Sequence, residues 1–133
     1  MKARLFTTAA ILMAVAVILG AMGAHALEKH LAPESIESFA TGVRYHIYHA
    51  LALLVIASVY DKLRFPRVRV AVQSLLIGIL LFSGSIYALT IGNLVEVALA
   101  PYIWWVTPLG GLLLIFGWAV LASAAWPIRS SNI

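Results

Sequence analysis

The chain has no cysteine and little charge, and each scarcity excludes a class of protein. Without cysteine it forms no disulfide, no thiolate metal site and no iron–sulfur cluster. Only 11% of its 133 residues are charged, whereas 63% are hydrophobic. A soluble domain carries about 25% charged residues, so this chain has too few polar side chains to cover a water-exposed surface. We therefore expect an integral membrane protein with a single domain, residues 1–133.

Four hydrophobic runs are long enough to cross a bilayer as helices. A helix needs about 20 residues to span the hydrocarbon core of about 30 Å. The runs cover approximately residues 5–27, 40–60, 70–92 and 103–126. They predict an all-α fold, a bundle of four transmembrane helices.

The few charges are segregated along the chain. Basic residues lie before the first run, between the second and third runs and after the fourth: Lys2, Arg4, Lys62, Arg64, Arg67, Arg69 and Arg129. The other two loops hold Lys29 with the carboxylates Glu28, Glu34, Glu37 and Glu96. The positive-inside rule places both termini and the second loop in the cytoplasm. Because topology accounts for most of the formal charge of +4, we expect no nucleic-acid partner.

The end of the first run has two interpretations. Within GAMGAHALEKH, residues 20–30, Ala24-His25-Ala26 matches the A-x-A pattern of a signal-peptidase site. Alternatively, it is the end of a retained helix, with His25 at the water boundary. The apolar core of a signal peptide has about 7–15 residues, whereas residues 5–23 continue without charge for longer. We therefore expect the first helix to be retained.

Small residues recur at four-residue spacing in the first and third runs, as Ala16, Gly20 and Ala24 and as Gly84, Ala88 and Gly92. In lipid, small residues let helices approach closely. The residues expected to pack helices together are Gly20, Gly23, Gly84, Ala88 and Gly110. Packing within the bundle is the simpler interpretation, and association of two copies through one of these faces is the alternative.

Two segments at the ends of the hydrophobic runs have sequences that predict specific local structure. LAPESIESFATG, residues 31–42, predicts a short amphipathic outer segment between the first two helices, with Pro33 in a first turn. Near the fourth run, Thr107 is predicted to cap a helix that starts at Pro108. Aromatic residues predict an outer interfacial belt of Tyr102, Trp104 and Trp105 and an inner one at Trp126.

TGVRYHIYHALALL places polar or amphipathic side chains inside the second run: Arg44, Tyr45, His46, Tyr48 and His49. At about 100° per residue they cover an arc too wide to face lipid throughout, and ionisable residues inside a span are functional candidates. The candidate polar site comprises His25, Arg44, Tyr45, His46, His49 and Glu96; no catalytic residue is predicted. The structural alternative is that Arg44 and the tyrosines reach the headgroups, or that Arg44 pairs with Glu37 or Glu96.

His25, His46 and His49 are candidate ligands of a metal ion or haem. His46 and His49 lie about 60° apart on a helix, so both can address one ion. The predicted depths in the membrane oppose a site shared with His25. Measured from the cytoplasmic ends of the first two helices, His25 lies about 30 Å above Leu5, whereas His49 lies only about 16 Å above Tyr60. Metal–nitrogen bonds of about 2 Å do not bridge that gap unless a helix shifts or tilts. We therefore predict no cofactor and keep a His-ligated metal or haem as the alternative.

Four stretches taken together resemble one family: GAMGAHAL, FATGVRYHIYHALALL, GILLFSGSIYAL and TPLGGLLLIFGWAVLA. It is the bacterial family called domain of unknown function 423, which is similar to eukaryotic transmembrane protein 256. The resemblance covers nearly the whole chain and implies a four-helix inner-membrane protein with a retained first helix. It implies no established reaction, substrate or cofactor. The family's motif positions in this sequence, where position 46 also allows glutamine, are Gly23, His25, Arg44, Tyr45, His49, Ser83, Gly84, Pro108 and Gly110.

Three functions remain compatible with these features. The first is a structural or accessory protein that binds lipid or a larger membrane complex, because the chain has no phosphate loop, nucleophile–base motif or catalytic carboxylate pair. The second is a His-ligated haem or metal-binding redox protein. The third is a small oligomeric transporter or proton path that uses Arg44, His49, Tyr87 and Glu96. The expected partners are the lipid bilayer and either a membrane protein or a second copy of the chain.

Overall fold

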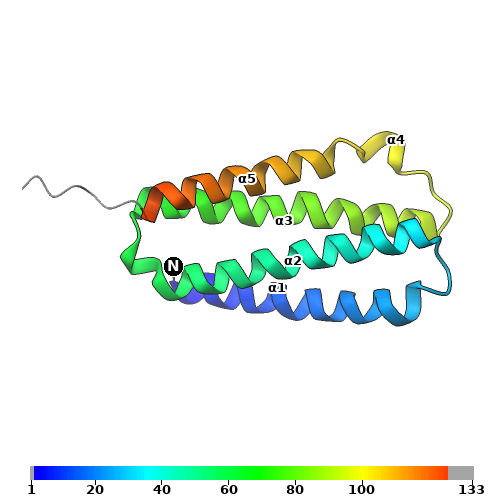
Figure 1. Ribbon diagram of the computed structural model, residues 1–133, viewed down its shortest axis with the longest axis horizontal. Helices are drawn as coiled ribbons and strands as arrows, with labels where there is room; N and C mark the ends of the chain where they lie inside the picture. The colour runs from blue at the N-terminus through cyan, green and yellow to red at the C-terminus, as the bar shows by residue number, and fades with distance from the viewer. Residues whose placement is uncertain (1, 126–133) are drawn as a thin grey trace, which may run out of the picture.

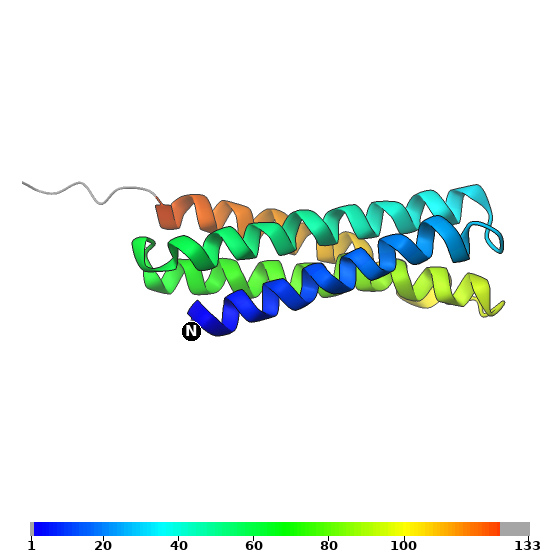
Figure 2. The same ribbon diagram turned by 90° about the horizontal axis from the view of Figure 1, so that it is seen from below.

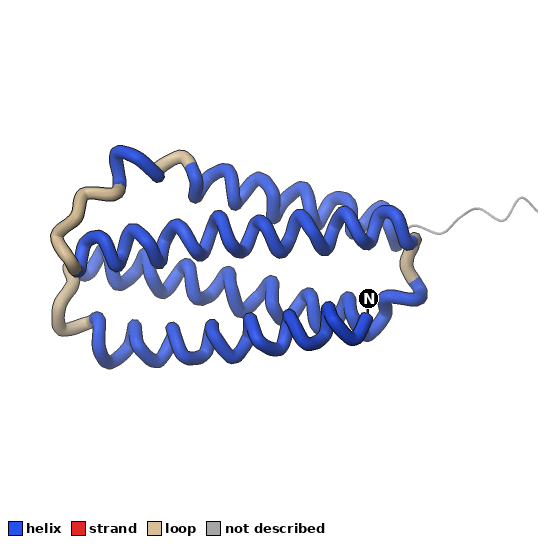
Figure 3. Tube along the Cα trace, turned by 180° about the vertical axis from the view of Figure 1, so that it is seen from behind, coloured by secondary structure: helices blue, strands red, loops and turns tan. Residues whose placement is uncertain are grey.

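The computed structural model describes residues 2–125, in which four long helices are joined by short loops (Figure 1). The first helix, α1, covers Lys2–Met22 and continues as a π-helical turn, η1, over Gly23–Leu27. The second, α2, covers Pro33–Val59 and leads into a 3-10 turn, η2, over Tyr60–Lys62. The described chain contains no strand (Figure 3).

The second half of the chain forms a matching hairpin. Helix α3 covers Phe65–Leu94, the short α4 covers Ala100–Ile103, and α5 covers Val106–Ala125. Each helix after the first has a proline in its first turn, where the missing N–H costs no intrahelical bond. These prolines are Pro33, Pro66, Pro101 and Pro108.

The helices pack in the order α5, α3, α2, α1, and neighbours run antiparallel (Figures 1 and 2). The start of α1, the α2–α3 connection and the end of α5 share one end of the bundle, called the basic end here for its lysines and arginines. The far end holds η1 and the loops on either side of α4. At the basic end, the Nζ of Lys2 donates to a carboxylate oxygen of Asp61 at 2.8 Å.

Helices α2 and α3 form the centre of the bundle, and α1 and α5 flank it. In the most apolar windows of α2 and α3, 44% of the residues are buried, against 17% in those of α1 and α4–α5. The core includes Leu53, Val68, Leu75 and Leu114. Large apolar side chains such as Ile18, Leu80 and Ile115 are exposed, as expected where the surrounding solvent is hydrocarbon. The molecule therefore has the apolar surface of an integral membrane protein.

The prediction of four spans is confirmed, and the structure extends them. Helices long and apolar enough to cross a membrane cover Lys2–Leu27, Pro33–Lys62, Phe65–Leu94 and Ala100–Ala124. Tyr102, Trp104 and Trp105 are exposed at the far end, as an interfacial belt requires. The predicted inner-belt Trp126 and the basic Arg129 lie outside the described residues.

Two boundary predictions are wrong. The amphipathic segment expected between the first two helices is instead the start of α2, which begins at Pro33 and continues without a break. Its apolar side chains stay in helical phase: Phe39 is buried against the bundle while Glu37 is exposed. Thr107 is not a cap, because α5 already begins at Val106 and the Thr107 hydroxyl lies 2.7 Å from the hydroxyl of Ser85 on α3.

The small residues expected in helix contacts differ in what they touch. At Gly110, an added Cβ would collide with the backbone of Phe82 on α3, and at Gly23 it would lie 2.8 Å from the Phe39 ring. At Gly20 it would make an ordinary 3.4 Å contact with Val43. At Gly84 it would meet only a side chain of its own helix, Leu80, at 3.8 Å. Gly84 therefore borders open space, and Ala88 beside it is half-buried.

Candidate functional site

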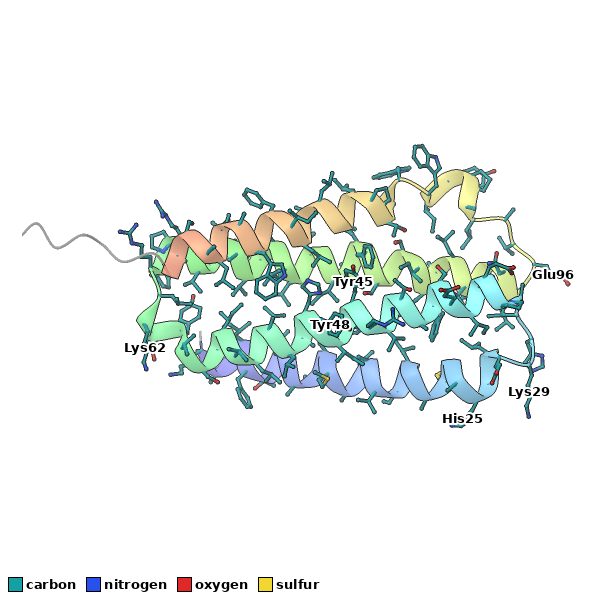
Figure 4. All side chains as sticks on the ribbon, in the orientation of Figure 1. His25, Lys29, Tyr45, Tyr48, Lys62 and Glu96 are labelled. Atoms are coloured by element: carbon teal, nitrogen blue, oxygen red, sulfur yellow. The ribbon has the colours of Figure 1, made fainter. Side chains whose placement is uncertain are left out.

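The structure distributes the six candidate polar residues over separate places. His25 is exposed in η1 and points away from the bundle, and Glu96 is exposed in the loop before α4 (Figure 4). Glu96 also has a φ of 58°, in the left-handed region. The other four residues lie on α2, where Arg44 and Tyr45 are exposed and His46 and His49 are buried. A single outer site containing all six is not formed.

Both ring nitrogens of His49 form hydrogen bonds. Its Nδ1 lies 2.7 Å from the carbonyl oxygen of Tyr45, one helical turn earlier. On the other side, the indole N–H of Trp118 on α5 donates to Nε2 at 3.1 Å. Because an indole nitrogen only donates, Nε2 must accept and Nδ1 must carry the proton. His49 therefore joins α2 to α5 in a fixed tautomer, with no free lone pair for a metal ion.

His46 faces a different helix and has one nitrogen without a partner. Its Nδ1 lies 3.2 Å from the hydroxyl of Tyr87 on α3. One turn away on α3, the hydroxyl of Ser83 donates to the carbonyl oxygen of Gly42 at 2.8 Å. The Nε2 of His46 is buried and has no hydrogen-bond partner among the described residues. His46, Ser83 and Tyr87 thus form a polar cluster between α2 and α3.

The three histidines do not converge on one point. His46 turns toward Tyr87 on α3, His49 turns toward Trp118 on α5, and His25 lies at the far end. Within residues 2–125, no group of three or more His, Cys, Asp or Glu side chains is placed to hold a metal ion. The spacing of three residues allowed a shared ion, but each imidazole is engaged by a different helix. The described geometry does not assemble the three-histidine site.

Arg44 borders a pocket of about 520 Å³ between α1 and α2, called the outer pocket here. Glu28 is the other charged residue in its lining, which is otherwise apolar and includes Gly20 and Phe39. The ion pair of Arg44 with Glu37 or Glu96, one of the structural alternatives, is not formed. Among the described residues, the one ion pair within 4.0 Å joins Lys2 to Asp61.

A second pocket, of about 280 Å³, lies between α1 and α3 near the basic end and is called the basic pocket here. Its lining contains two arginines and no carboxylate; the residues are Arg4, Leu5, Thr8, Tyr60, Arg69, Val72, Gln73 and Leu76. Sequence reasoning assigned the arginines to topology only. The available signal was the four-residue spacing of Arg4 with Thr8 and of Arg69 with Gln73, which places each pair on one helix face.

Comparisons with known proteins agree with this architecture. The model of a family described as "Protein of unknown function (DUF423)" matches residues 19–111. The chain is similar to the UPF0382 membrane protein YwdK of Bacillus subtilis, at 40% identity over 84% of this chain and 86% of that protein. A UPF0382 membrane protein of Haemophilus influenzae is 37% identical over 98% of this chain and 99% of its own.

The UPF0382 inner membrane protein YgdD of Escherichia coli is 32% identical over 88% of this chain and 85% of its own. No solved structure matches the chain. The matched residues 19–111 contain every member of the candidate polar site, from His25 to Glu96.

Proposed function

Because the chain belongs to the DUF423 family of membrane proteins, whose function is unknown, we propose a function from its own geometry. The protein is a small accessory protein of the bacterial inner membrane that binds anionic phospholipid in the basic pocket. Both termini lie on the cytoplasmic side. The observation that carries this proposal is the pairing of Arg4 and Arg69 in a pocket without an acidic residue.

The chemistry of the basic pocket suits a lipid phosphate. Arginine presents a planar fork of N–H donors that matches phosphate oxygens. Basic pockets between helices at the cytoplasmic side of a membrane are sites for anionic headgroups. Thr8 and Gln73 add neutral donors beside Arg4 and Arg69. Leu5, Val72 and Leu76 supply apolar contacts for the start of an acyl chain.

The outer pocket is a weaker candidate for the same ligand. It combines Arg44 with Glu28, so its two charges cancel and give no preference for an anion. The basic pocket also shares its end of the bundle with Lys62, Arg64 and Arg67. This accumulation of positive charge supports a cytoplasmic position for that end.

Lipid titration of the full chain in mild detergent tests the proposal. Phosphatidylglycerol and phosphatidylcholine with identical acyl chains are added, and native mass spectrometry measures the bound fraction. A direct hydrogen bond from an arginine in the pocket to the lipid phosphate contributes about 1 kcal/mol. The double variant Arg4→Gln with Arg69→Gln is therefore expected to bind phosphatidylglycerol about 30-fold more weakly, since about 1.4 kcal/mol corresponds to tenfold.

The matched control removes the same charge from the same end outside the pocket. Lys62 is exposed, and Arg67 donates to the backbone oxygen of Ser123 at 2.9 Å. The double variant Lys62→Gln with Arg67→Gln is expected to keep nearly the original affinity. Equal binding of the two lipids, or equal losses in both double variants, would refute a specific site.

A further inference from the structure

The outer pocket, of about 520 Å³, contains two opposite charges without a partner among the described residues. Arg44 on α2 and Glu28, which directly follows η1, both contribute to its lining. Neither side chain forms an ion pair or a hydrogen bond within residues 2–125. The two charges therefore do not neutralise each other directly, and both remain available to a ligand.

The depth of Arg44 in the membrane makes its lack of a partner costly. The second span, Pro33–Lys62, has 30 residues and is about 45 Å long at the helical rise. Arg44 follows Pro33 by eleven residues. With the span centred on a hydrocarbon core of about 30 Å, Arg44 lies about 9 Å inside the nearer edge of that core. Arginines at such depth reach toward the interface and pair with other groups. Because Arg44 is exposed, a lipid is able to supply that group.

We propose that the outer pocket binds the zwitterionic headgroup of phosphatidylethanolamine, with the phosphate on Arg44 and the ammonium group on Glu28. This inference goes beyond the proposed function, because it concerns a different class of lipid at the opposite end of the bundle. The basic pocket has no carboxylate and suits an anion, whereas the outer pocket carries one charge of each sign.

The two charges lie in the order that this phospholipid requires. An added Cβ at Gly20 would contact Val43, so Gly20 on α1 lies level with the part of α2 that carries Arg44. Glu28 follows Gly20 by eight residues, roughly 12 Å farther toward the far end at the helical rise. In a membrane, the acyl chains of phosphatidylethanolamine lie in the core, the phosphate follows, and the amine comes last. Arg44 therefore matches the phosphate, and Glu28 matches the amine.

The antiparallel directions of the two helices bring these side chains toward each other. In an α-helix each Cα–Cβ bond tilts toward the N-terminus of the helix. The N-terminus of α2 lies at the far end, so Arg44 tilts toward that end (Figure 1). The first helix runs the opposite way, and Glu28 still has helical backbone angles, so it tilts back toward the bilayer. The two charged groups thus approach a headgroup from its two ends.

The rest of the lining suits the part of a phospholipid next to its headgroup. Ile36, Phe39, Val43 and Ile47 provide apolar contacts for the glycerol and the first methylenes of the acyl chains. Gly23, in η1, packs so closely that an added Cβ would lie 2.8 Å from the Phe39 ring. Such π-helical turns are frequent at functional sites. The pocket volume lies within the range of about 300–1,000 Å³ that ligand sites occupy.

Glu28 distinguishes phosphatidylethanolamine from phosphatidylcholine. A primary ammonium group has three N–H donors, and a carboxylate accepts them. The trimethylammonium group of choline has no such donor. Both lipids carry the same phosphate, so Arg44 contributes to the binding of both, and the preference for the primary amine depends on Glu28.

Native mass spectrometry of the full chain in mild detergent tests this proposal. The probes are phosphatidylethanolamine, its N,N-dimethyl derivative and phosphatidylcholine, all with identical acyl chains. Affinity is expected to fall about fivefold along this series, the effect of about 1 kcal/mol for an exposed ion pair. Glu28→Gln should abolish the preference. Arg44→Gln should weaken binding of all three lipids about fivefold and keep their order, because it removes a hydrogen bond to the phosphate.

Two exposed residues near the pocket but outside its lining provide matched controls. Glu37→Gln removes a carboxylate and Lys29→Gln removes a positive charge, and both should keep the full preference. Arg4→Gln with Arg69→Gln should also keep it, so failure of the proposal for the basic pocket and failure of this one are distinguishable. Glycerophosphoethanolamine, the same headgroup without acyl chains, should not displace the lipid.

The lipid series is measured on the unaltered chain, so its outcome does not depend on the folding of a variant. Equal affinities for the three lipids would overturn the proposal. A preference that survives Glu28→Gln, or that Glu37→Gln removes equally, would also overturn it. Displacement by glycerophosphoethanolamine at the concentration of the lipid would assign the pocket to a soluble zwitterion instead.

Discussion

Two histidines three residues apart on α2 serve different neighbours. His49 joins α2 to α5 through Trp118, and its two nitrogens are both used. His46 lies beside Tyr87 on α3 and keeps Nε2 unpaired. Similar burial therefore leads to different chemistry: His49 is a structural link, whereas His46 has a free hydrogen-bonding position.

We predict that His49 and Trp118 are energetically coupled. His49→Phe leaves the indole N–H of Trp118 without its acceptor, which costs about 1–3 kcal/mol of unfolding free energy in hydrocarbon, where no water replaces the lost partner. In a double-mutant cycle with Trp118→Phe, the coupling should be about 0.6–1.7 kcal/mol, which runs from the average to the maximum for hydrogen bonds between membrane helices. Reversible unfolding in mixed micelles by titration with dodecyl sulfate measures all four corners. Strictly additive effects would exclude the bond as a stabilising contact.

The hydrogen-bond partners of the polar side chains on α2 were the part of the molecule that the sequence predicted least well. The polar residues of α2 were recognised because ionisable side chains are rare inside a span. Their partners were not, because Tyr87 lies 41 residues from His46 and Trp118 lies 69 residues from His49. In a bilayer both the lipid and the protein interior are apolar, so the pattern of hydrophobic residues does not fix which way a helix is rotated.

At the scale of helices, close packing of α3 against α5 holds the second hairpin together. Gly110 on α5 lies against the backbone of Phe82 on α3, so only a residue without a Cβ fits there. Gly78 on α3 likewise approaches Leu114 on α5. The sequence pattern of small residues predicted close packing in general, and it identified Gly110 but missed Gly78.

Adjacent glycines on α5 give a matched pair of substitutions. Gly110→Ala should destabilise the protein by about 1–3 kcal/mol, because an overpacked contact must displace the backbone of α3. At Gly111 an added Cβ makes an ordinary 3.6 Å contact with the Phe82 ring, so Gly111→Ala should be neutral or slightly stabilising. Unfolding in mixed micelles compares the two. Equal stabilities of the variants would mean that α3 and α5 do not approach as described.

Element boundaries were predicted less well than the elements themselves. Hydropathy gave four spans because each exceeds the length that crosses a bilayer. It placed the start of the second span at residue 40, whereas α2 begins at Pro33. Glutamates and serines in the first turns lowered the local hydropathy, but a helix tolerates them on its exposed face while Phe39 stays buried.

For the whole molecule, charge segregation predicts one orientation in the membrane. The absence of native cysteine makes this directly testable, since a single cysteine can be introduced at Lys29 or at Lys62. In spheroplasts, a membrane-impermeant maleimide should label Lys29→Cys at once and Lys62→Cys only after lysis, because the positive-inside rule predicts that the basic end lies inside. The reverse labelling pattern would mean that the basic end faces the outside of the cell and that the basic pocket lies in the outer leaflet.

The function proposed for the whole molecule rests on the basic pocket between α1 and α3. Its two arginines, Arg4 and Arg69, suit a lipid phosphate. Sequence alone did not show this pocket, because it is built from residues of separate helices.

The most direct test of lipid binding is native mass spectrometry of the full chain released straight from bacterial membranes into mild detergent. We predict that the chain carries a tightly held phosphatidylglycerol or cardiolipin molecule. This adduct should be lost in the variant with Arg4→Gln and Arg69→Gln and kept in the variant with Lys62→Gln and Arg67→Gln. A chain that emerges without lipid, or one whose adduct survives the loss of both pocket arginines, would contradict it.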